Sequence, residues 1–162
     1  MKRLLLLATG GTIAGCADDS ATLNDYTAGV LGGDALLAGV PELNSLAEIT
    51  VEQIANVDSA DLLFEHWRAL LERIRDAFAV DPDLAGVVIT HGTNTLEETA
   101  WLLQLLIGDP RPVVLVGAMR PATALSADGP LNLLQAVQVA MSPEARGHGV
   151  LVVMDSQIHA AQ

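Results

Sequence analysis

Four short apolar runs divide the sequence and constrain its fold more than any other feature. Each is entered or left through Gly or Pro, and together they cover residues 3–8, 86–90, 112–116 and 150–154. Runs that are apolar at every position are typical of strands covered on both faces, as in parallel sheets. The sequence therefore predicts buried strands in these four places, with a further strand at about residues 48–57.

Helical patterns separate these strands. Residues 61–78 repeat apolar side chains at intervals of three and four, with charges opposite. Residues 95–107 begin at Thr95, which we expect to cap the helix, and carry two glutamates in the first turn. Residues 131–141 follow a Gly-Pro start. Strands alternating with helices predict an α/β fold, a three-layer sandwich with a mostly parallel sheet.

Composition limits both the size and the partners of the protein. The 162 residues, 51% of them hydrophobic, predict one domain spanning residues 1–162. The formal net charge of -12 would repel nucleic acids and anionic membrane surfaces, so we expect neither as a partner. The apolar start of the chain imitates a signal peptide but ends in a Thr-Gly-Gly turn, which favours a first strand. With one cysteine, Cys16, no internal disulfide can form, and we expect a cytoplasmic protein.

Two polar segments follow predicted strands, where open parallel sheets bind ligands. They read TGGT at residues 9–12 and THGTNT at residues 90–95. Their glycines let backbone amides and threonine hydroxyls approach a small ligand, and the second segment opens a helix whose amides favour an oxyanion. The first segment lacks the Gly-Lys-Ser/Thr ending and the G-x-G-x-x-G pattern, so nucleotide binding is disfavoured. His91 fits a buried core histidine as well as a ligand.

Metal and cofactor chemistry is not indicated, because no two histidines have the spacing of metal ligands. Tyr26 is the only tyrosine. It lies in the polar segment of residues 10–33, which holds six of the fourteen glycines and is long enough for a lid or a disordered loop. A packing role explains a lone tyrosine poorly there, so we favour a functional one.

These segments resemble a known family. LLLATGGTIAG, HGTNTLEETA and VGAMRPATALSADGPLNLLQAV are similar to three ordered motifs of bacterial-type L-asparaginases, and the resemblance covers nearly the whole chain. It implies a flavodoxin-like arrangement and the hydrolysis of asparagine, often with slower action on glutamine, to the acid and ammonia. It also implies a homo-oligomer, usually a tetramer of intimate dimers, that needs no cofactor.

The resemblance assigns roles to individual residues. Thr12 corresponds to the nucleophile, Tyr26 to the tyrosine that helps to activate it, and Thr93 to the threonine of a Thr-Lys-Asp relay. Ser59 would contact the substrate α-carboxylate, and the backbone at Ala118 would face the leaving amide. The predicted substrate-binding set also includes Gly11, Asp58 and Gly92. An amide is a poor electrophile, so such a site needs an activated hydroxyl, donors for the oxyanion and a lid that excludes water.

The chain departs from the family pattern in two ways. The motif His-Gly-Thr-Asp-Thr reads His-Gly-Thr-Asn-Thr here, so a neutral amide, Asn94, replaces the carboxylate expected to hold the substrate α-amino group. Loss of one relay member commonly costs roughly 10³ to 10⁴ in turnover. The relay lysine and the smaller C-terminal domain would lie beyond residue 162, and Lys2 is the only lysine.

The sequence therefore predicts an asparaginase N-terminal catalytic domain with low or no activity and with apolar surface that promotes self-association. Two alternatives stay open. One is a non-catalytic amino-acid-binding or assembly module that kept the pocket. The other is a related amidotransferase subunit acting on misacylated tRNA, which the net charge of -12 disfavours.

Overall fold

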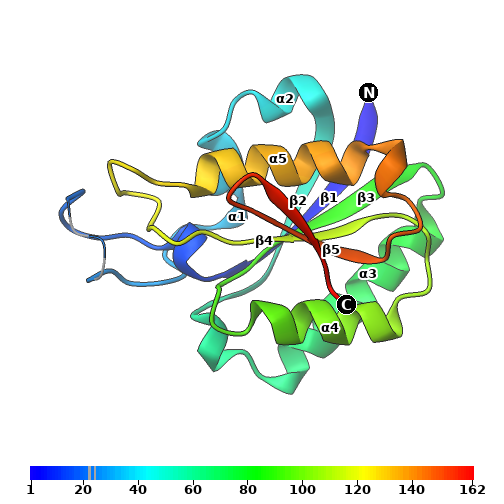
Figure 1. Cartoon of the computed structure of the whole chain (residues 1–162), viewed down its shortest axis with the longest axis horizontal. Coiled ribbons are helices and arrows are strands. Elements are labelled where there is room, and N and C mark those ends of the chain that lie inside the picture. The colour runs from blue at the N-terminus through cyan, green and yellow to red at the C-terminus, as the bar shows by residue number, and fades with distance from the viewer. Residues whose placement is uncertain (22, 24) are drawn as a thin grey trace.

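A computed structural model describes the whole chain except residues 22 and 24. Its centre is a six-stranded sheet of order β2-β1-β3-β4-β5-β6 (Figure 1). The strands are β1 (Lys2–Gly10), β2 (Ala47–Val57), β3 (Leu84–Thr90), β4 (Val113–Val116), β5 (Val150–Met154) and β6 (Gln157–Ala160). The first five are parallel, and β6 pairs antiparallel with β5. The predicted α/β fold with a mostly parallel sheet is confirmed.

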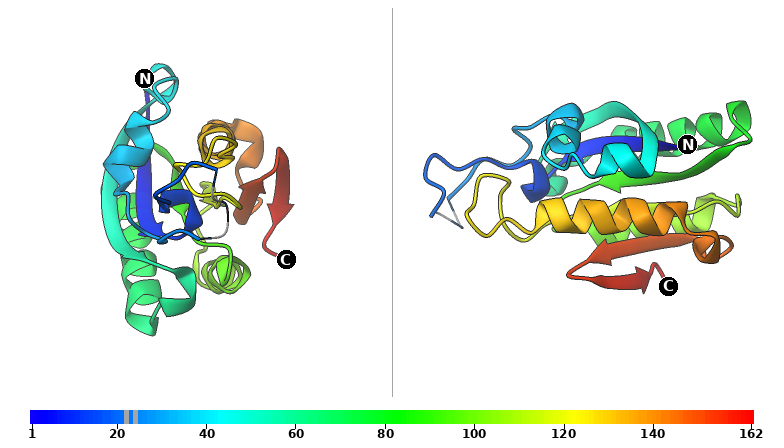
Figure 2. Two further views of the ribbon diagram at one scale, coloured as in Figure 1. Left: turned by 90° about the vertical axis from the view of Figure 1, so that its left-hand side faces the viewer. Right: turned by 90° about the horizontal axis from the view of Figure 1, so that it is seen from above.

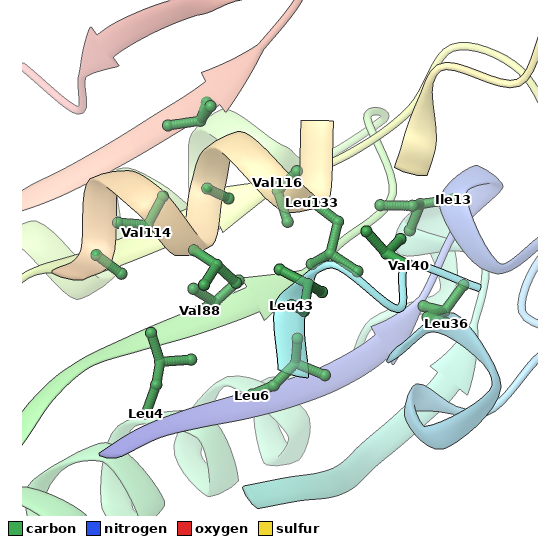
Figure 3. Close-up of a cluster of buried hydrophobic side chains, with 14 of the residues drawn as sticks. Leu4, Leu6, Ile13, Leu36, Val40, Leu43, Val88, Val114, Val116 and Leu133 are labelled. Carbon is green, nitrogen blue, oxygen red and sulfur yellow. The ribbon is translucent and has the colours of Figure 1, made fainter. Parts of the chain in front are cut away.

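Helices cover both faces of the sheet (Figures 1 and 2). On one face lie α1 (Gly33–Ala38), α2 (Leu43–Leu46) and α5 (Gly129–Met141); on the other lie α3 (Phe64–Val80) and α4 (Leu96–Leu106). This double cover explains why the strands are apolar at successive positions. In β1, Leu4 and Leu6 belong to the core under α5, as Figure 3 shows, whereas Leu5 and Leu7 belong to the core against α3 and α4.

The start of α3 differs from the prediction. The sequence predicts a helix from Asp61, but α3 begins at Phe64. The reason is a separate 3-10 turn, η2 (Ser59–Asp61), in which the Asp58 side chain accepts the backbone N–H of Ala60. This turn keeps Asp58 and Ser59 at the end of β2 instead of drawing them into the helix.

Several elements were not predicted at all. β6 is exposed along its whole length and follows β5 through a tight turn in which Asp155 and Ser156 have positive φ values of 50° and 58°. Because β6 is an edge strand with no buried residue, it lacks the apolar run by which the other strands were predicted. The short helices α1 and α2 also lie where the sequence shows no long periodic pattern. No helix in the described part of the chain is long and apolar enough to cross a membrane.

The segment after β1 folds back on itself. It begins with a 3-10 turn, η1 (Thr12–Ala14), and its two arms are joined by a backbone bridge between Cys16 and Thr27. It also lies beside the loop that follows β4, because Ala122 N–H donates to Gly15 O at 2.8 Å. Both loops extend from the same end of the sheet (Figure 1).

Candidate active site

Three chain segments meet where β1, β2 and β3 end. Gly11 N–H donates to Val57 O at 2.8 Å, which joins the ends of β1 and β2. A Cβ atom on Gly11 would lie 2.3 Å from Gly92 Cα, and one on Gly92 would lie 2.7 Å from Ser59 Oγ. Only glycine fits at either position, so the two motifs are in direct backbone contact.

Gly11 has a structural role that the sequence did not indicate. Gly11 was predicted as part of the substrate-binding set, and in the structure its N–H donates to Val57 O. Its φ of 79° and ψ of -172° fall in a region that is essentially restricted to glycine. Gly11 therefore brings the backbones together and turns the chain so that Thr12 follows at the junction.

Thr12 and Tyr26 form the central pair of the site. Thr12 Oγ1 lies 2.7 Å from Tyr26 Oη, a hydrogen bond in which either oxygen is able to donate. Thr12 is 8% exposed and Tyr26 is half-buried. The tyrosine ring packs on Gly15, where an added Cβ would lie 2.8 Å from Cδ2. The structure thus brings together two residues that are 14 positions apart, as the resemblance implied.

Ser59 connects β2 to the start of α4. It is 2% exposed, and its Oγ accepts the backbone N–H groups of Asn94 at 3.1 Å and Thr95 at 3.3 Å. Thr95 Oγ1 donates to Ser59 O at 2.8 Å. Thr95 is the N-cap residue of α4, as predicted, but its side chain makes no capping bond, because its hydroxyl is used in this contact. The Ser59 hydroxyl still has its own hydrogen to donate.

Asp58 and Asn94 are in contact across the site. Asn94 Nδ2 donates to Asp58 Oδ1 at 2.9 Å, and the same oxygen accepts Ala60 N–H at 2.9 Å. Because a carboxylate only accepts, the contact orients the amide with its nitrogen toward Asp58 and its oxygen away. The sequence placed both residues in the substrate-binding region but did not predict their pairing.

The loop after β4 forms another wall. Ala118 is fully buried, and the Asp128 carboxylate accepts the N–H groups of Met119 and Arg120, each at 2.9 Å. Asn132 Nδ2 bonds to Asp128 at 3.2 Å and to Gly117 O at 3.1 Å. Asp128 and Asn132 thus set the path of the backbone at Ala118. The sequence signal for this role was a polar residue on the buried side of an otherwise apolar helix.

His91 is a buried, hydrogen-bonded core residue, which settles the two readings left open by the sequence. It is fully buried; its Nδ1 donates to Gly92 O at 2.6 Å and its Nε2 accepts from Thr99 Oγ1 at 2.8 Å. Trp67 Nε1 donates to the same Thr99 oxygen at 2.8 Å. Burial lowers the pKa of His91, so the ring stays neutral and this chain of bonds fixes the Gly92 carbonyl.

Lys2 lies away from the site, and the described residues offer no metal-binding cluster. Lys2 begins β1, at the end of the strand opposite to Thr12, and its Nζ donates to Met141 O. Among the residues that the structure describes, no three His, Cys, Asp or Glu side chains are grouped so that they could hold a metal ion.

The fold and these contacts define the class of protein: an α/β protein whose candidate site joins a threonine–tyrosine pair to the loops after three parallel strands. Comparison with known proteins then identifies the family. Residues 3–162 match the family model described as Asparaginase, N-terminal, so the chain belongs to the asparaginase family.

Named relatives agree with this assignment. The chain is 47% identical to L-asparaginase 2 of Bacillus subtilis over 162 residues, which is 100% of this chain and 43% of the relative. It is 46% identical to a glutaminase-asparaginase of Acinetobacter glutaminasificans, covering 99% of this chain and 48% of that protein. A crystal structure of a probable cytoplasmic L-asparaginase from Campylobacter jejuni superposes with a TM-score of 0.96 at 48% identity, covering 99% of this chain and 49% of that one. The chain thus spans about half the length of these relatives.

Proposed function

We propose that residues 1–162 form the N-terminal catalytic domain of an L-asparagine amidohydrolase, which converts L-asparagine and water to L-aspartate and ammonia. The observation that carries this proposal is the 2.7 Å hydrogen bond between Thr12 Oγ1 and Tyr26 Oη. A threonine hydroxyl is a weak nucleophile on its own, and a bonded proton acceptor is what activates it. Membership of the asparaginase family supports the choice of a linear amide as substrate.

The proposed reaction has two halves. Thr12 Oγ1 attacks the side-chain amide carbon as Tyr26 Oη accepts the Thr12 proton and passes its own phenolic proton to the amide nitrogen; the C–N bond then breaks, ammonia leaves and an ester on Thr12 remains. Water then attacks the resulting ester, which frees L-aspartate and the Thr12 hydroxyl. Asp128 and Asn132 hold the backbone around Ala118 in place, and that backbone would face the leaving amide. The glutaminase-asparaginase relative supports L-glutamine as a second substrate.

Turnover by this chain should be low. Asn94 has no charge with which to strengthen a proton relay, and Thr93 directs its methyl group at Gly117, where an added Cβ would lie 3.1 Å from Thr93 Cγ2. The only lysine, Lys2, lies at the far end of β1. Among the described residues, the site therefore has one hydrogen-bonded pair of hydroxyls, Thr12 and Tyr26, and Lys2 is bonded elsewhere, to Met141 O.

Ammonia release from L-asparagine tests the proposal, measured with a coupled assay sensitive to slow turnover. Thr12→Ala should reduce release to the level of buffer alone. Thr27→Ala, which removes an exposed threonine hydroxyl from the same loop, is the matched control and should have no effect. Equal release by the wild-type chain and Thr12→Ala would refute Thr12 as nucleophile. Binding of L-asparagine without any release would instead support the non-catalytic module.

We also propose that the protein forms homo-oligomers. Large apolar side chains are exposed close to the site on two loops and at the start of α3: Leu63 at 58%, Phe64 at 74%, Met119 at 67% and Leu125 at 86%. Apolar side chains gathered at one end of a molecule favour association. A cytoplasmic location is proposed as well, supported by the single Cys16, and cell fractionation with an antibody to the chain would test it.

A further inference from the structure

The strand β2 bulges away from β1 just before the candidate site. The two strands pair residue by residue as far as Ala8 and Gln53. The next pair is Gly10 and Val57, so a single residue of β1 lies opposite residues 54–56 of β2. A bulge disrupts the ladder locally, and the backbone groups that it frees need other hydrogen-bond partners.

The side-chain amide of Gln53 supplies such partners. Its Nε2 donates to Ala8 O on β1 at 3.2 Å and to Ala55 O within the bulge at 2.5 Å. Its Oε1 accepts the N–H of Gly33, the first residue of α1, at 2.9 Å. Only this orientation of the amide satisfies all three groups, because a carbonyl accepts and an N–H donates. One side chain thus fixes the end of β1, the bulge and the start of α1 relative to one another.

The bulge in turn contacts both arms of the loop that follows β1. On the first arm, Gly11 N–H donates to Val57 O at 2.8 Å. On the returning arm, a Cβ added to Gly29 would lie 2.8 Å from the backbone carbon of Asn56, and Gly29 N–H donates to Gly11 O at 3.1 Å. The bulge is therefore in contact with the chain directly before the proposed nucleophile and shortly after the proposed proton acceptor.

We propose that Gln53 is a positioning residue for the proposed reaction, and that it sets the distance between Thr12 Oγ1 and Tyr26 Oη by holding the bulge in β2. The inference rests on the proposed function of that pair and assigns Gln53 no contact with the substrate. The 2.7 Å hydrogen bond joins residues on the two arms of the loop, and both arms contact β2 at the bulge. Because a displacement of about 1 Å costs roughly 10²-fold in rate, Gln53 acts on turnover without touching the reacting atoms.

Two substitutions at position 53 separate the contacts of the amide. Gln53→Met has a similar length and removes all three hydrogen bonds. Gln53→Glu keeps an acceptor for Gly33 N–H but loses both donors and sets a carboxylate against the two carbonyls. Gln104→Met is the matched control, because Gln104 Oε1 also bonds to backbone, at Val150 N–H, but at the end of the sheet opposite to the site.

Steady-state ammonia release from L-asparagine measures turnover, and the isotope-labelled ring of Tyr26, the only tyrosine, reports the pair by NMR. Thr12→Ala supplies the ring signal in the absence of the hydrogen bond. Both Gln53 variants should lower kcat by roughly 10- to 100-fold, change KM by less than about 2-fold, and move the Tyr26 signal toward that of Thr12→Ala. Gln104→Met should lower the urea midpoint of unfolding but leave kcat and the Tyr26 signal unchanged.

A Gln53 variant that is folded by circular dichroism and keeps the wild-type kcat and Tyr26 signal would overturn the inference. A lower kcat with an unmoved Tyr26 signal would also overturn it, because the loss would not pass through the pair. A signal that moves in Gln53→Met but not in Gln53→Glu would assign the effect to the start of α1 and equally reject the role of the bulge. Absence of ammonia release by the wild-type chain would contradict the proposed function, while the Tyr26 signal would still test how the pair is positioned.

Discussion

Substitution of Gly11 by Ala tests the contact on which the whole site depends. The added Cβ would lie 2.3 Å from both Gly92 Cα and Gly92 N, and 2.9 Å from His91 C. All three are backbone atoms, so no side chain is able to rotate away. Either the end of β1 or the segment after β3 must move, and Thr12, the next residue, must move from its position beside Tyr26.

The size of the effect follows from two terms. Holding a non-glycine residue at a φ of 79° and ψ of -172° costs about 1–3 kcal/mol. Forcing a methyl group into a filled space costs about another 1–3 kcal/mol. Gly11→Ala should therefore lower the free energy of unfolding by about 2–6 kcal/mol, a large part of the roughly 5–15 kcal/mol that holds a domain together.

Urea unfolding followed by circular dichroism would measure this change, with Gly108→Ala as the control. Gly108 has no atom within 4 Å of an added Cβ, so that variant should be neutral or gain about 0.4–1 kcal/mol through a less flexible unfolded chain. The Gly11→Ala chain should also lose the hydrogen bond between Thr12 and Tyr26. A loss of less than about 1 kcal/mol in Gly11→Ala would show that the two motifs are not in backbone contact.

Three further outcomes are expected. Tyr26→Phe should reduce ammonia release by roughly 10²- to 10⁴-fold, the usual contribution of a proton acceptor, with far-UV circular dichroism unchanged. Burial holds the pKa of His91 below its unfolded value, so below about pH 6.5 the unfolded chain takes up a proton that the folded chain does not. The free energy of unfolding should therefore decline as the pH falls from 7 to 5. His91→Gln should flatten this slope in urea titrations. Arg111→Ala should cost about 2–4 kcal/mol in the same assay, because the 8% exposed guanidinium pairs with Asp109 and donates to two carbonyls at the end of α3.

The layers of the fold were predictable because burial on both faces leaves a direct mark on sequence. Leu4 to Leu7 alternate between the two cores, and a strand with that property has no polar position. β6 has the opposite property: all four of its residues are exposed, and its position depends on pairing with β5 through the turn at Asp155 and Ser156. Pairing of that kind is a tertiary event, and periodicity does not record it.

The site was only partly predictable for the same reason. The sequence alone placed the TGGT and THGTNT segments at one edge of the sheet, since parallel strands end together. It did not bring Tyr26 to Thr12, because their contact depends on the return of the loop through the Cys16–Thr27 bridge and on the space above Gly15. Only the family resemblance implied that pair, and the 2.7 Å distance between their oxygens agrees with it.

The exchange at position 94 shows why a departure from a motif must be judged with its neighbours. Considered alone, Asn94 removes the carboxylate that the resemblance assigns to the substrate α-amino group. In the structure it donates to Asp58, 36 residues away along the chain, so this corner still holds one carboxylate. Replacing Asn94 by Asp would therefore create two facing carboxylates instead of restoring one. That replacement alone places two like charges at hydrogen-bond distance, and their repulsion opposes joint ionisation of the two carboxylates.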